Sequence, residues 1–556
     1  MSTLIEPHKD TVDSLFKRFE QLNEIGAALS NERDINKLLE NILVAAKTIT
    51  RADGGTLYRV TEDESSLRFE IVRNDKLKIA MGGASGAPIP FPPLPLRTAD
   101  GKENNSMVAA YAAIHQKTVN IADAYVADGF DFSGTRKFDE NTGYRSQSFL
   151  TVPMKNHENE VIGVLQLINS LDPETNQVVP FSPADQRLAE SLASQAAIAL
   201  TNRQLILQLE ELFESFIQLI NLAIDEKSRY TGGHCERVPT LTMMLAEAVN
   251  ETKSGPLADF NLTDKDRYEL KIAGLLHDCG KVTTPVHVVD KATKLHTLFD
   301  RIELVDTRFE VLKRDAEIAK LRAQLALRSN QDDSSEMALS DTYEKSLAQL
   351  EQDRAFLRHA NIGGELMKPE DQERVKKIGQ GYRWLGVQGN ELNFLTEDEL
   401  ENLTIRAGTL TQTEREVINH HIVATIKMLE QLPWPKHLKN VPEYAGGHHE
   451  RMDGKGYPRG LKREEMSVQA RVMGIADIFE ALTARDRPYK PGKTLSDSLH
   501  ILGKFKENGH IDPDLFDIFV EKKVYLKYAE KFLDAEQIDQ VDESKIPGYQ
   551  HCGAVR

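Results

Sequence analysis

Apolar residues recur every three or four positions in several long stretches of the chain, which is the spacing of one face of an α-helix. Residues 34–49 show this pattern first, and Asp34 at the start of the stretch is a candidate N-cap. We therefore predict an amphipathic helix there. Its apolar positions are Ile35, Leu38, Leu39, Ile42, Leu43, Ala46 and Ile49.

Short runs rich in β-branched and aromatic residues follow this helix and predict strands. The segment 87–96, APIPFPPLPL, lies between the second and third runs, and its five prolines predict a loop. With a further helix, the runs predict an α+β domain over 21–182, preceded by a helix or tail over 1–20. The runs are 54–60, 66–72, 117–123, 148–156 and 161–169.

A long helix is expected over 183–228, because no helix breaker occurs after its first few residues. Its apolar positions step by 4, 3, 4, 3 and 4, which is the a/d seam of a two-stranded coiled coil. The stripe is narrow and flanked by Glu, Gln and Asn, so we predict a linker that forms a parallel homodimer. A helix packed on its own domain is the alternative. The seam residues are Leu205, Leu209, Leu212, Phe216, Leu219 and Ala223.

The same spacing returns on both sides of the polar segment SNQDDSS (329–335). It predicts an antiparallel helical hairpin within 298–405, followed by the irregular segment GQGYRWLGVQGN. This stretch interrupts a larger domain over 229–530, and a tail over 531–556 follows. The hairpin's apolar positions are Leu298, Ile302, Val305, Phe309, Leu312, Ala316 and Ala319 on one side, and Tyr343, Leu347, Leu350 and Leu357 on the other.

Composition and charge limit the kinds of partner and the cellular compartment that we expect for this protein. The formal net charge of −17 over 556 residues disfavours binding of polymeric DNA or RNA, which needs a basic surface. The three cysteines form no CxxC pair, so we expect a reducing compartment, with Cys235 and Cys279 as small buried apolar residues. The first residues carry no signal-peptide pattern, and no run of eighteen apolar residues occurs. We therefore expect a cytoplasmic protein without a membrane span.

Histidines and aspartates recur in apolar surroundings along the second half of the chain. Each alone is compatible with a satisfied core residue or a helix cap, but burying so many without a shared partner is costly. A metal centre supplies that partner, and imidazole with carboxylate suits Fe, Mn or Zn. One carboxylate can bridge two ions, an arrangement suited to phosphate-ester hydrolysis. The residues are His234, His277, Asp278, one of the pair His420–His421, His448, His449 and Asp477.

Three segments resemble the HD-GYP family of cyclic di-GMP phosphodiesterases, a branch of the metal-dependent HD phosphohydrolases. They are HDCGK (277–281), HHERMDGKGYP (448–458) and RVMGIADIFEALTARDRPYK (471–490). The resemblance covers about 229–297 and 406–520. It implies an all-α domain that cleaves cyclic di-GMP to the linear dinucleotide. The alternatives are another cyclic dinucleotide, such as a mixed guanine–adenine one, or a receptor that binds without catalysis.

The resemblance also implies a role for each site residue. One metal would be held by His234, His277, Asp278 and Asp477, and Asp278 would bridge to a second metal on His421, His448 and His449. The family register favours His421 over His420. Lys281 would contact the scissile phosphate, while Tyr457, Arg487 and Lys490 would bind the dinucleotide. Tyr230 stands where some members carry a glutamate for a third metal, so two ions, iron or manganese, are expected.

The family runs quickly from the HDxGK motif to the next histidine, whereas this chain inserts more than a hundred residues. The segments DKATKLHTLFDRIE and RAGTLTQTERE on either side resemble two copies of one family segment. The ends of the insertion are therefore expected to lie close together. We expect the insertion to be a regulatory element or the docking site of a protein partner.

The N-terminal domain resembles a GAF domain, a sensor of small ligands, through residues 137–156 and 160–170. The type is that of cyclic-nucleotide phosphodiesterases and adenylyl cyclases, which implies a cyclic nucleotide as a candidate ligand. Ser170 replaces the lysine of that type's signature. A structural or dimerising GAF domain without a ligand is the alternative. The candidate ligand-binding residues are Phe138, Asp139, Glu140 and Asn169.

Overall fold

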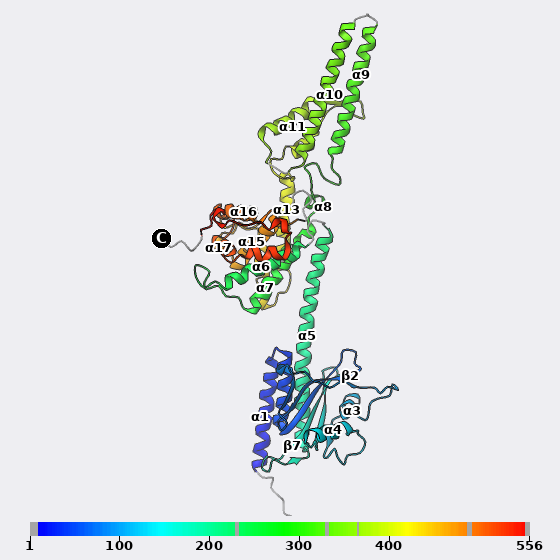
Figure 1. The fold of residues 1–556 in the computed structure, drawn as a ribbon, viewed down its shortest axis with the longest axis vertical. Helices are drawn as coiled ribbons and strands as arrows, with labels where there is room; N and C mark the ends of the chain where they lie inside the picture. The colour runs from blue at the N-terminus through cyan, green and yellow to red at the C-terminus, as the bar shows by residue number, and fades with distance from the viewer. Residues whose placement is uncertain (1–8, 228–232, 329–332, 364–365, 486–491, 551–556) are drawn as a thin grey trace, which may run out of the picture. The chain divides into compact units, whose positions relative to one another are not determined.

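A computed structural model describes residues 9–227, 233–328, 333–363, 366–485 and 492–550 (Figure 1). The chain divides into two compact units, with the boundary between Phe213 and Glu214. Among the helices of the described residues, none has both the length and the apolar character that crossing a bilayer requires.

The first unit contains a six-strand antiparallel path in the order β3-β2-β1-β7-β6-β5, with two short strands at its margins. The five predicted runs are confirmed as β1, β2, β5, β6 and β7. The prediction of an uninterrupted loop over 87–96 was wrong, because Leu94 and Pro95 form β4 at the edge of β2, where proline is tolerated. The strands are β1 Ala52–Val60, β2 Ser66–Asn74, β3 Ile79–Gly82, β4 Leu94–Pro95, β5 Val119–Ile121, β6 Phe149–Lys155, β7 Val161–Leu171 and β8 Val178–Val179.

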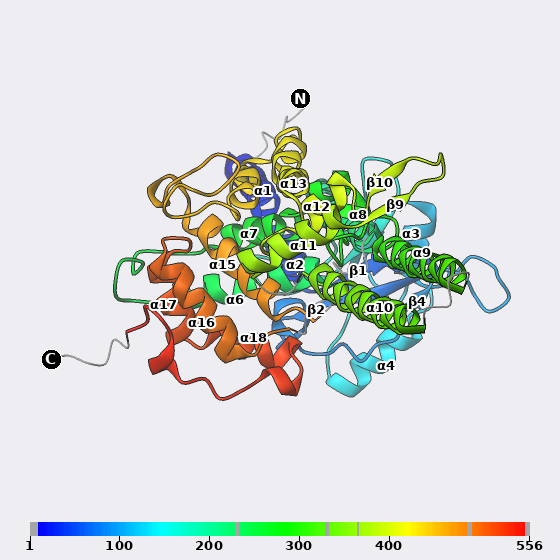
Figure 2. The same cartoon turned by 90° about the horizontal axis from the view of Figure 1, so that it is seen from above.

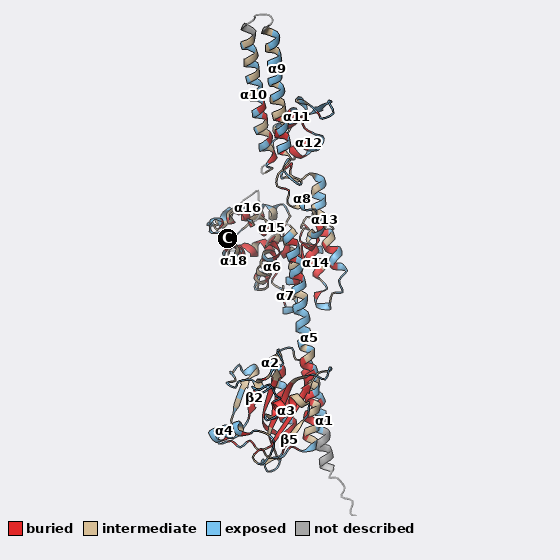
Figure 3. Cartoon of the chain, turned by 90° about the vertical axis from the view of Figure 1, so that its right-hand side faces the viewer, coloured by how far each residue is buried: buried red, intermediate tan, exposed pale blue. Residues whose placement is uncertain are grey.

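Helices cover both faces of this sheet (Figure 3). Alternation along the strands sends Leu57 of β1 into a core with α1, α2 and the start of α5, while Tyr58 faces the α3 side. The predicted amphipathic helix is confirmed as α2, and Asp34 accepts hydrogen bonds from the N–H groups of Asn36 and Lys37. The helices are α1 Lys9–Asn31, α2 Ile35–Thr50, α3 Val108–His115, α4 Ser133–Thr142 and α5 Pro183–Lys227.

Helix α5 is 45 residues long. Its predicted seam is exposed in the isolated chain, with fractions of 50% at Leu205, 67% at Leu209 and 58% at Leu219. Ile217 and Ile224, on another face of the helix, are buried. The apolar stripe thus has no covering partner among the described residues of one chain.

The second unit is built from helices that surround the predicted histidine and aspartate residues. Helix α6 packs against α7 and α15, and α13 packs against the turn η2 that follows α7. The elements outside the insertion are α6 His234–Asn250, α7 Asp264–Leu276, η2 Cys279–Thr283, α8 Val286–Val289, α13 Gln412–Glu430, η3 Lys436–Leu438, α14 Val441–Gly446, η4 Arg463–Glu465, α15 Val468–Thr483, α16 Leu495–Glu507, α17 Pro513–Glu521, α18 Val524–Phe532, η5 Ala535–Gln537 and η6 Glu543–Lys545.

The inserted segment has its own small hydrophobic core, which includes Phe309, Leu357 and Phe394. Helices α9 and α10 run side by side away from it (Figures 1 and 2). The prediction of an irregular segment after the helical hairpin was wrong, because β9 and β10 form a β-hairpin whose turn uses Gly389 at a φ of 77°. The elements are α9 Ile302–Arg328, α10 Asp333–Asn361, α11 Pro369–Gly381, β9 Arg383–Leu385, β10 Glu391–Asn393 and α12 Glu397–Leu403.

Two buried lysines hold the ends of the insertion together. Lys291 Nζ lies 2.7 Å from Asn402 Oδ1 and 2.7 Å from Glu414 Oε2. Lys294 Nζ donates to the carbonyl oxygens of Leu403 and Ile405, at 3.1 and 2.8 Å. The chain before the insertion therefore lies beside the chain after it, as the repeated segment predicted.

Candidate metal centre

Five helices bring the predicted histidines and aspartates together inside the second unit. His234 is the first residue of α6, His277 is the C-cap of α7, and Asp278 follows it at the start of η2. His421 lies within α13, His448 and His449 follow α14, and Asp477 lies on α15. The candidate ligand atoms form two triads, each with its atoms within 4.8 Å of one another: His234, His277 and Asp278, and His421, His448 and His449.

Asp278 belongs to the first triad and also faces the second. Its Oδ2 atom lies 3.0 Å from His234 Nε2 and 3.2 Å from His277 Nε2. Its other oxygen, Oδ1, lies 3.2 Å from His421 Nε2. Asp477 adds a second carboxylate, with Oδ1 3.5 Å from His234 Nε2. One carboxylate thus presents an oxygen to each triad, which is the arrangement needed to bridge two cations.

Backbone carbonyls orient three of the imidazole rings. In each case Nδ1 donates to the carbonyl three residues earlier, at 2.7 Å from His277 to Gly274, 2.5 Å from His421 to Ile418 and 2.6 Å from His448 to Ala445. The proton therefore lies on Nδ1, and Nε2 keeps its lone pair for a cation.

The buried lone pairs show that a metal fits this donor set. His448 Nε2 is buried without a hydrogen-bond partner among the described residues. His277 Nε2 lies 3.2 Å from the carboxylate oxygen Asp278 Oδ2, so two acceptors face each other there. Buried acceptors without donors are costly, and a divalent cation would satisfy them.

The charges are consistent with metal ligation. Burial alone would raise the pKa of Asp278, but Lys281 and His277 outweigh it and hold the pKa well below its usual value. Burial, reinforced by His277, lowers the pKa of His448 to about 4. The site therefore offers an ionised carboxylate and a neutral imidazole at neutral pH, which are the ligating forms.

Glu480 is a site residue that the sequence reasoning missed. Its Oε2 accepts a hydrogen bond from His234 Nδ1 at 2.7 Å, and its Oε1 accepts one from Arg237 Nε at 2.7 Å. Burial would lower the pKa of His234, but this carboxylate, together with Asp278, outweighs burial and raises it to about 9, so Glu480 makes the ring more basic. The available signal was spacing, because Glu480 follows Asp477 by three residues on one helix.

The Gly-Tyr-Pro loop lies against the second triad. The Tyr457 ring stacks on the His449 ring with 4.8 Å between centroids and 25° between planes. A Cβ on Gly456 would lie 2.4 Å from the Arg451 nitrogen, so only glycine fits there. The buried Glu450 carboxylate holds the loop closed by accepting from the N–H groups of Arg459 and Leu461, at 2.7 and 2.9 Å.

The turn η2, which follows Asp278, packs closely against α13. A Cβ on Gly280 would lie 2.0 Å from the carbonyl oxygen of His421, and the Gly280 N–H donates to the Thr425 hydroxyl at 2.9 Å. Lys281 Nζ lies 2.5 Å from Asp278 Oδ2. Glycine at 280 therefore lets η2 approach α13, which brings Asp278 and His421 together.

The other residues singled out in the sequence lie outside the two triads or outside the described residues. Arg487, Lys490 and Tyr230 lie outside the described residues. His420 is exposed, whereas His421 is buried at the site. Cys235 and Cys279 are buried as expected, and burial raises the pKa of the Cys279 thiol to about 11.

In the first unit, Phe138 lines a cavity between the sheet and α4. The Asp139 carboxylate instead accepts hydrogen bonds from Tyr125 and Ser146. Asn169 bonds with the backbone at Gln147 and with Tyr144. Glu140 is exposed. Of the four candidate ligand-binding residues, therefore, Phe138 alone lines this cavity.

Three regions of the chain match known domain families: the GAF domain over residues 34–200, and the HD domain over residues 231–374 and again over residues 397–515. The chain therefore carries an N-terminal GAF domain followed by an HD domain. The insertion lies across the two HD matches.

Two curated bacterial proteins are similar to part of the chain. The 3′3′-cGAMP-specific phosphodiesterase 1 of Vibrio cholerae is 35% identical over 120 residues, which are 22% of this chain and 27% of that protein. The cyclic di-GMP phosphodiesterase of Thermotoga maritima is 37% identical over 148 residues, which are 27% of this chain and 38% of that protein. The chain thus spans well under two thirds of either relative.

Proposed function

We propose that this chain is a metal-dependent phosphodiesterase that hydrolyses cyclic di-GMP to linear pGpG. The observation that carries the proposal is the pair of neighbouring triads, in which Asp278 of the first triad also presents an oxygen to His421 of the second. The similarity to enzymes named for cyclic dinucleotides supports the choice of substrate class.

In this proposal, His234, His277 and Asp477 would hold one divalent ion, and His421, His448 and His449 would hold the other. Asp278 would serve both, and iron or manganese suits this mixture of imidazole and carboxylate. The bound ions would supply water activated at neutral pH and stabilisation of the developing negative charge. The remaining steps, which bind the substrate and donate a proton, are assigned to side chains of the protein.

Lys281 is proposed to bind the scissile phosphate and to provide a proton. Burial would lower the pKa of Lys281, but Asp278 and Asp477 raise it, so the side chain stays charged. Water adds to phosphorus and releases a proton to solvent, the bond to the ribose 3′-oxygen breaks, and that oxygen takes a proton from Nζ, which solvent then reprotonates. The product keeps a 5′-phosphate and a free 3′-hydroxyl, which is linear pGpG. Tyr457, Arg487 and Lys490 are proposed to hold the dinucleotide.

The mixed cyclic GMP–AMP is the second candidate substrate, because the Vibrio cholerae relative is named for it. A receptor without catalysis is a third reading, but a receptor has no need of a charged lysine beside a bridging carboxylate. Under the main proposal, the GAF domain regulates the HD domain.

The test is turnover on cyclic di-GMP, cyclic GMP–AMP and cyclic di-AMP, with metal content measured on the same sample. We expect about two ions per chain and fastest cleavage of cyclic di-GMP. Asp278→Ala should lower turnover by about a hundredfold or more, because a bridging ligand serves both ions. Asp264→Ala, on the exposed first turn of α7, is the matched control. Turnover within tenfold of the parent in Asp278→Ala at unchanged metal content would exclude the bridging role.

A further inference from the structure

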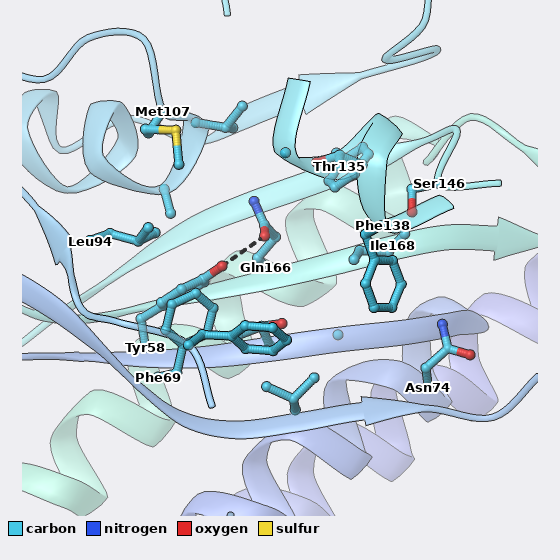
Figure 4. A pocket seen from close by; sticks show the side chains of 18 of the residues that line it. Tyr58, Phe69, Asn74, Leu94, Met107, Thr135, Phe138, Ser146, Gln166 and Ile168 are labelled. Atoms are coloured by element: carbon cyan, nitrogen blue, oxygen red, sulfur yellow. Dashed lines mark hydrogen bonds between the residues drawn. The ribbon is translucent and has the colours of Figure 1, made fainter. Parts of the chain in front are cut away.

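The GAF domain contains a cavity of about 490 Å³, partly open to solvent, between its sheet and the segments that contain α3 and α4 (Figure 4). Strands β1, β2 and β7 form one side through Tyr58, Phe69 and Gln166. Phe138 of α4 closes the other side. The volume lies within the range of cavities that bury a small organic ligand.

Aromatic rings dominate the walls of this cavity. Tyr58 and Phe69 lie 4.7 Å apart between centroids, and Phe69 lies 5.3 Å from Phe91. Phe132 and Phe149 form a second pair at 5.5 Å. Such walls favour a flat ligand that offers its faces to ring edges and faces.

The cavity offers little to balance a ligand's negative charge. Among its lining residues, all of them described, Arg73 and Asp131 carry the charges. The Arg73 guanidinium donates to Glu40 and to the carbonyls of Val72 and Met81, at 2.7, 2.9 and 2.7 Å. Its charge and these donors are therefore engaged within the protein.

The N-terminus of α4 also reaches the cavity, through Ser133, Gly134 and Thr135. A helix N-terminus attracts anions, but a carboxylate of the chain already occupies this one. Asp131 Oδ1 accepts from the Ser133 N–H at 2.8 Å. Hydrogen bonds from the Ser133 side chain and backbone lower the pKa of Asp131, so a negative charge stands there at neutral pH.

Tyr58 and Gln166 form a polar pair in the cavity wall that could hydrogen-bond to a neutral ligand. The Tyr58 hydroxyl donates to Gln166 Oε1 at 3.1 Å, as Figure 4 shows, and Gln166 Nε2 donates to the Thr151 hydroxyl at 3.1 Å. The Gln166 amide keeps a second N–H, and the Tyr58 oxygen keeps lone pairs. A ligand with one donor and one acceptor on an edge could pair with both.

We propose that this cavity binds an uncharged aromatic or heteroaromatic molecule with a hydrogen-bonding edge, and that it does not bind cyclic nucleotides. A cyclic nucleotide would place its phosphate among aromatic walls, an engaged arginine and a carboxylate. An anion buried without a free counter-charge is strongly disfavoured. This ligand class is independent of the activity of the HD domain.

Calorimetry on the full-length chain tests the proposal with adenine and indole as uncharged probes and with cyclic AMP and cyclic GMP as anionic probes. We expect saturable binding of an uncharged probe, and cyclic AMP at least about tenfold weaker than adenine, because the two share a base and cyclic AMP adds a ribose and an anionic phosphate. Phe138→Ala removes a ring of the cavity and should weaken adenine or indole binding about three- to tenfold. Lys137→Ala, on the exposed neighbouring position of α4, should leave it unchanged.

The dependence on Phe138 separates this cavity from the dinucleotide site of the HD domain. Cyclic nucleotide binding that matches or exceeds adenine binding and is lost in Phe138→Ala would overturn the proposal. Absence of saturable binding of both adenine and indole at millimolar concentration would also overturn it.

Discussion

At the scale of single residues, Glu480 is expected to set the strength of the first triad. It accepts from His234 Nδ1 and thereby fixes the ring with Nε2 toward Asp278. Glu480→Gln keeps the shape of the side chain but removes the charge that makes the ring a stronger base. We expect the protein to fold and metal affinity to fall about 10- to 100-fold, measured by competition with a chelator. Glu464→Gln, at an exposed position, is the control, and unchanged affinity in Glu480→Gln would refute the role.

The sequence predicted residues whose chemistry is concentrated in short motifs. His277, Asp278 and Lys281 lie within five positions, so one short segment contains a proposed metal ligand, a proposed bridging carboxylate and a cation. Glu480 was missed because a glutamate on a helix is ordinary until burial and a histidine partner are known. Asp139 and Asn169 were named as ligand-binding candidates, but their side chains bond within the domain. Such hydrogen bonding depends on tertiary contacts that spacing alone does not reveal.

At the scale of elements, the exposed stripe of α5 predicts a homodimer. Leu212 and Leu219 are 53% and 58% exposed and occupy seam positions of the heptad. Lysine at both positions would place charges in the seam, so we expect Leu212→Lys/Leu219→Lys to convert a dimer to a monomer. Light scattering measures the change in mass.

The matched control adds the same two charges outside the seam. Gln204 and Gln218 are exposed residues of the same helix at positions away from the seam, and Gln204→Lys/Gln218→Lys should keep the dimer. If the seam variant retains the parent mass, or if the parent is itself monomeric, the stripe is not a dimer interface.

Element type was predictable where an apolar pattern was long. Helix α2 has a sustained 3.6-residue period and a capping aspartate, so its position was clear from the sequence. Strands β9 and β10 have three residues each, too few to show alternation, and glycines surround their turn. Strand β4 consists of Leu94 and Pro95 within a proline-rich segment. Its pairing with β2 is a tertiary contact without a local signal.

At the scale of the whole molecule, the insertion has two parts. The inner part is anchored to the HD domain. The outer part, residues 314–347, is the far end of the helical hairpin formed by α9 and α10. The inner part contains the core around Phe309 and the two lysine anchors. The Lys291 anchor reaches Glu414, in the first turn of α13, the helix that carries His421. In contrast, the described residues of 314–347 contribute no buried apolar side chain to the core.

This division predicts the result of a truncation. Lys313 pairs with Glu351 across the hairpin, so residues 313 and 348 are near enough for a short Gly/Ser turn to replace 314–347. We expect the shortened protein to keep its metal content, with turnover of cyclic di-GMP within about twofold of the parent, because no core contact is removed. Binding of a protein partner, if the hairpin docks one, would be lost.

Lys291→Met supplies the contrasting variant, because it leaves the hairpin whole and removes the inner anchor. The Lys291 side chain is 1% exposed, and breaking a buried ion pair on one side costs about 3–5 kcal/mol. We therefore expect Lys291→Met to lower the free energy of unfolding in denaturant titration and to weaken metal retention at the triad that contains His421. If the truncation strips the metals while Lys291→Met retains them, the outer hairpin supports the site and the inner anchor does not.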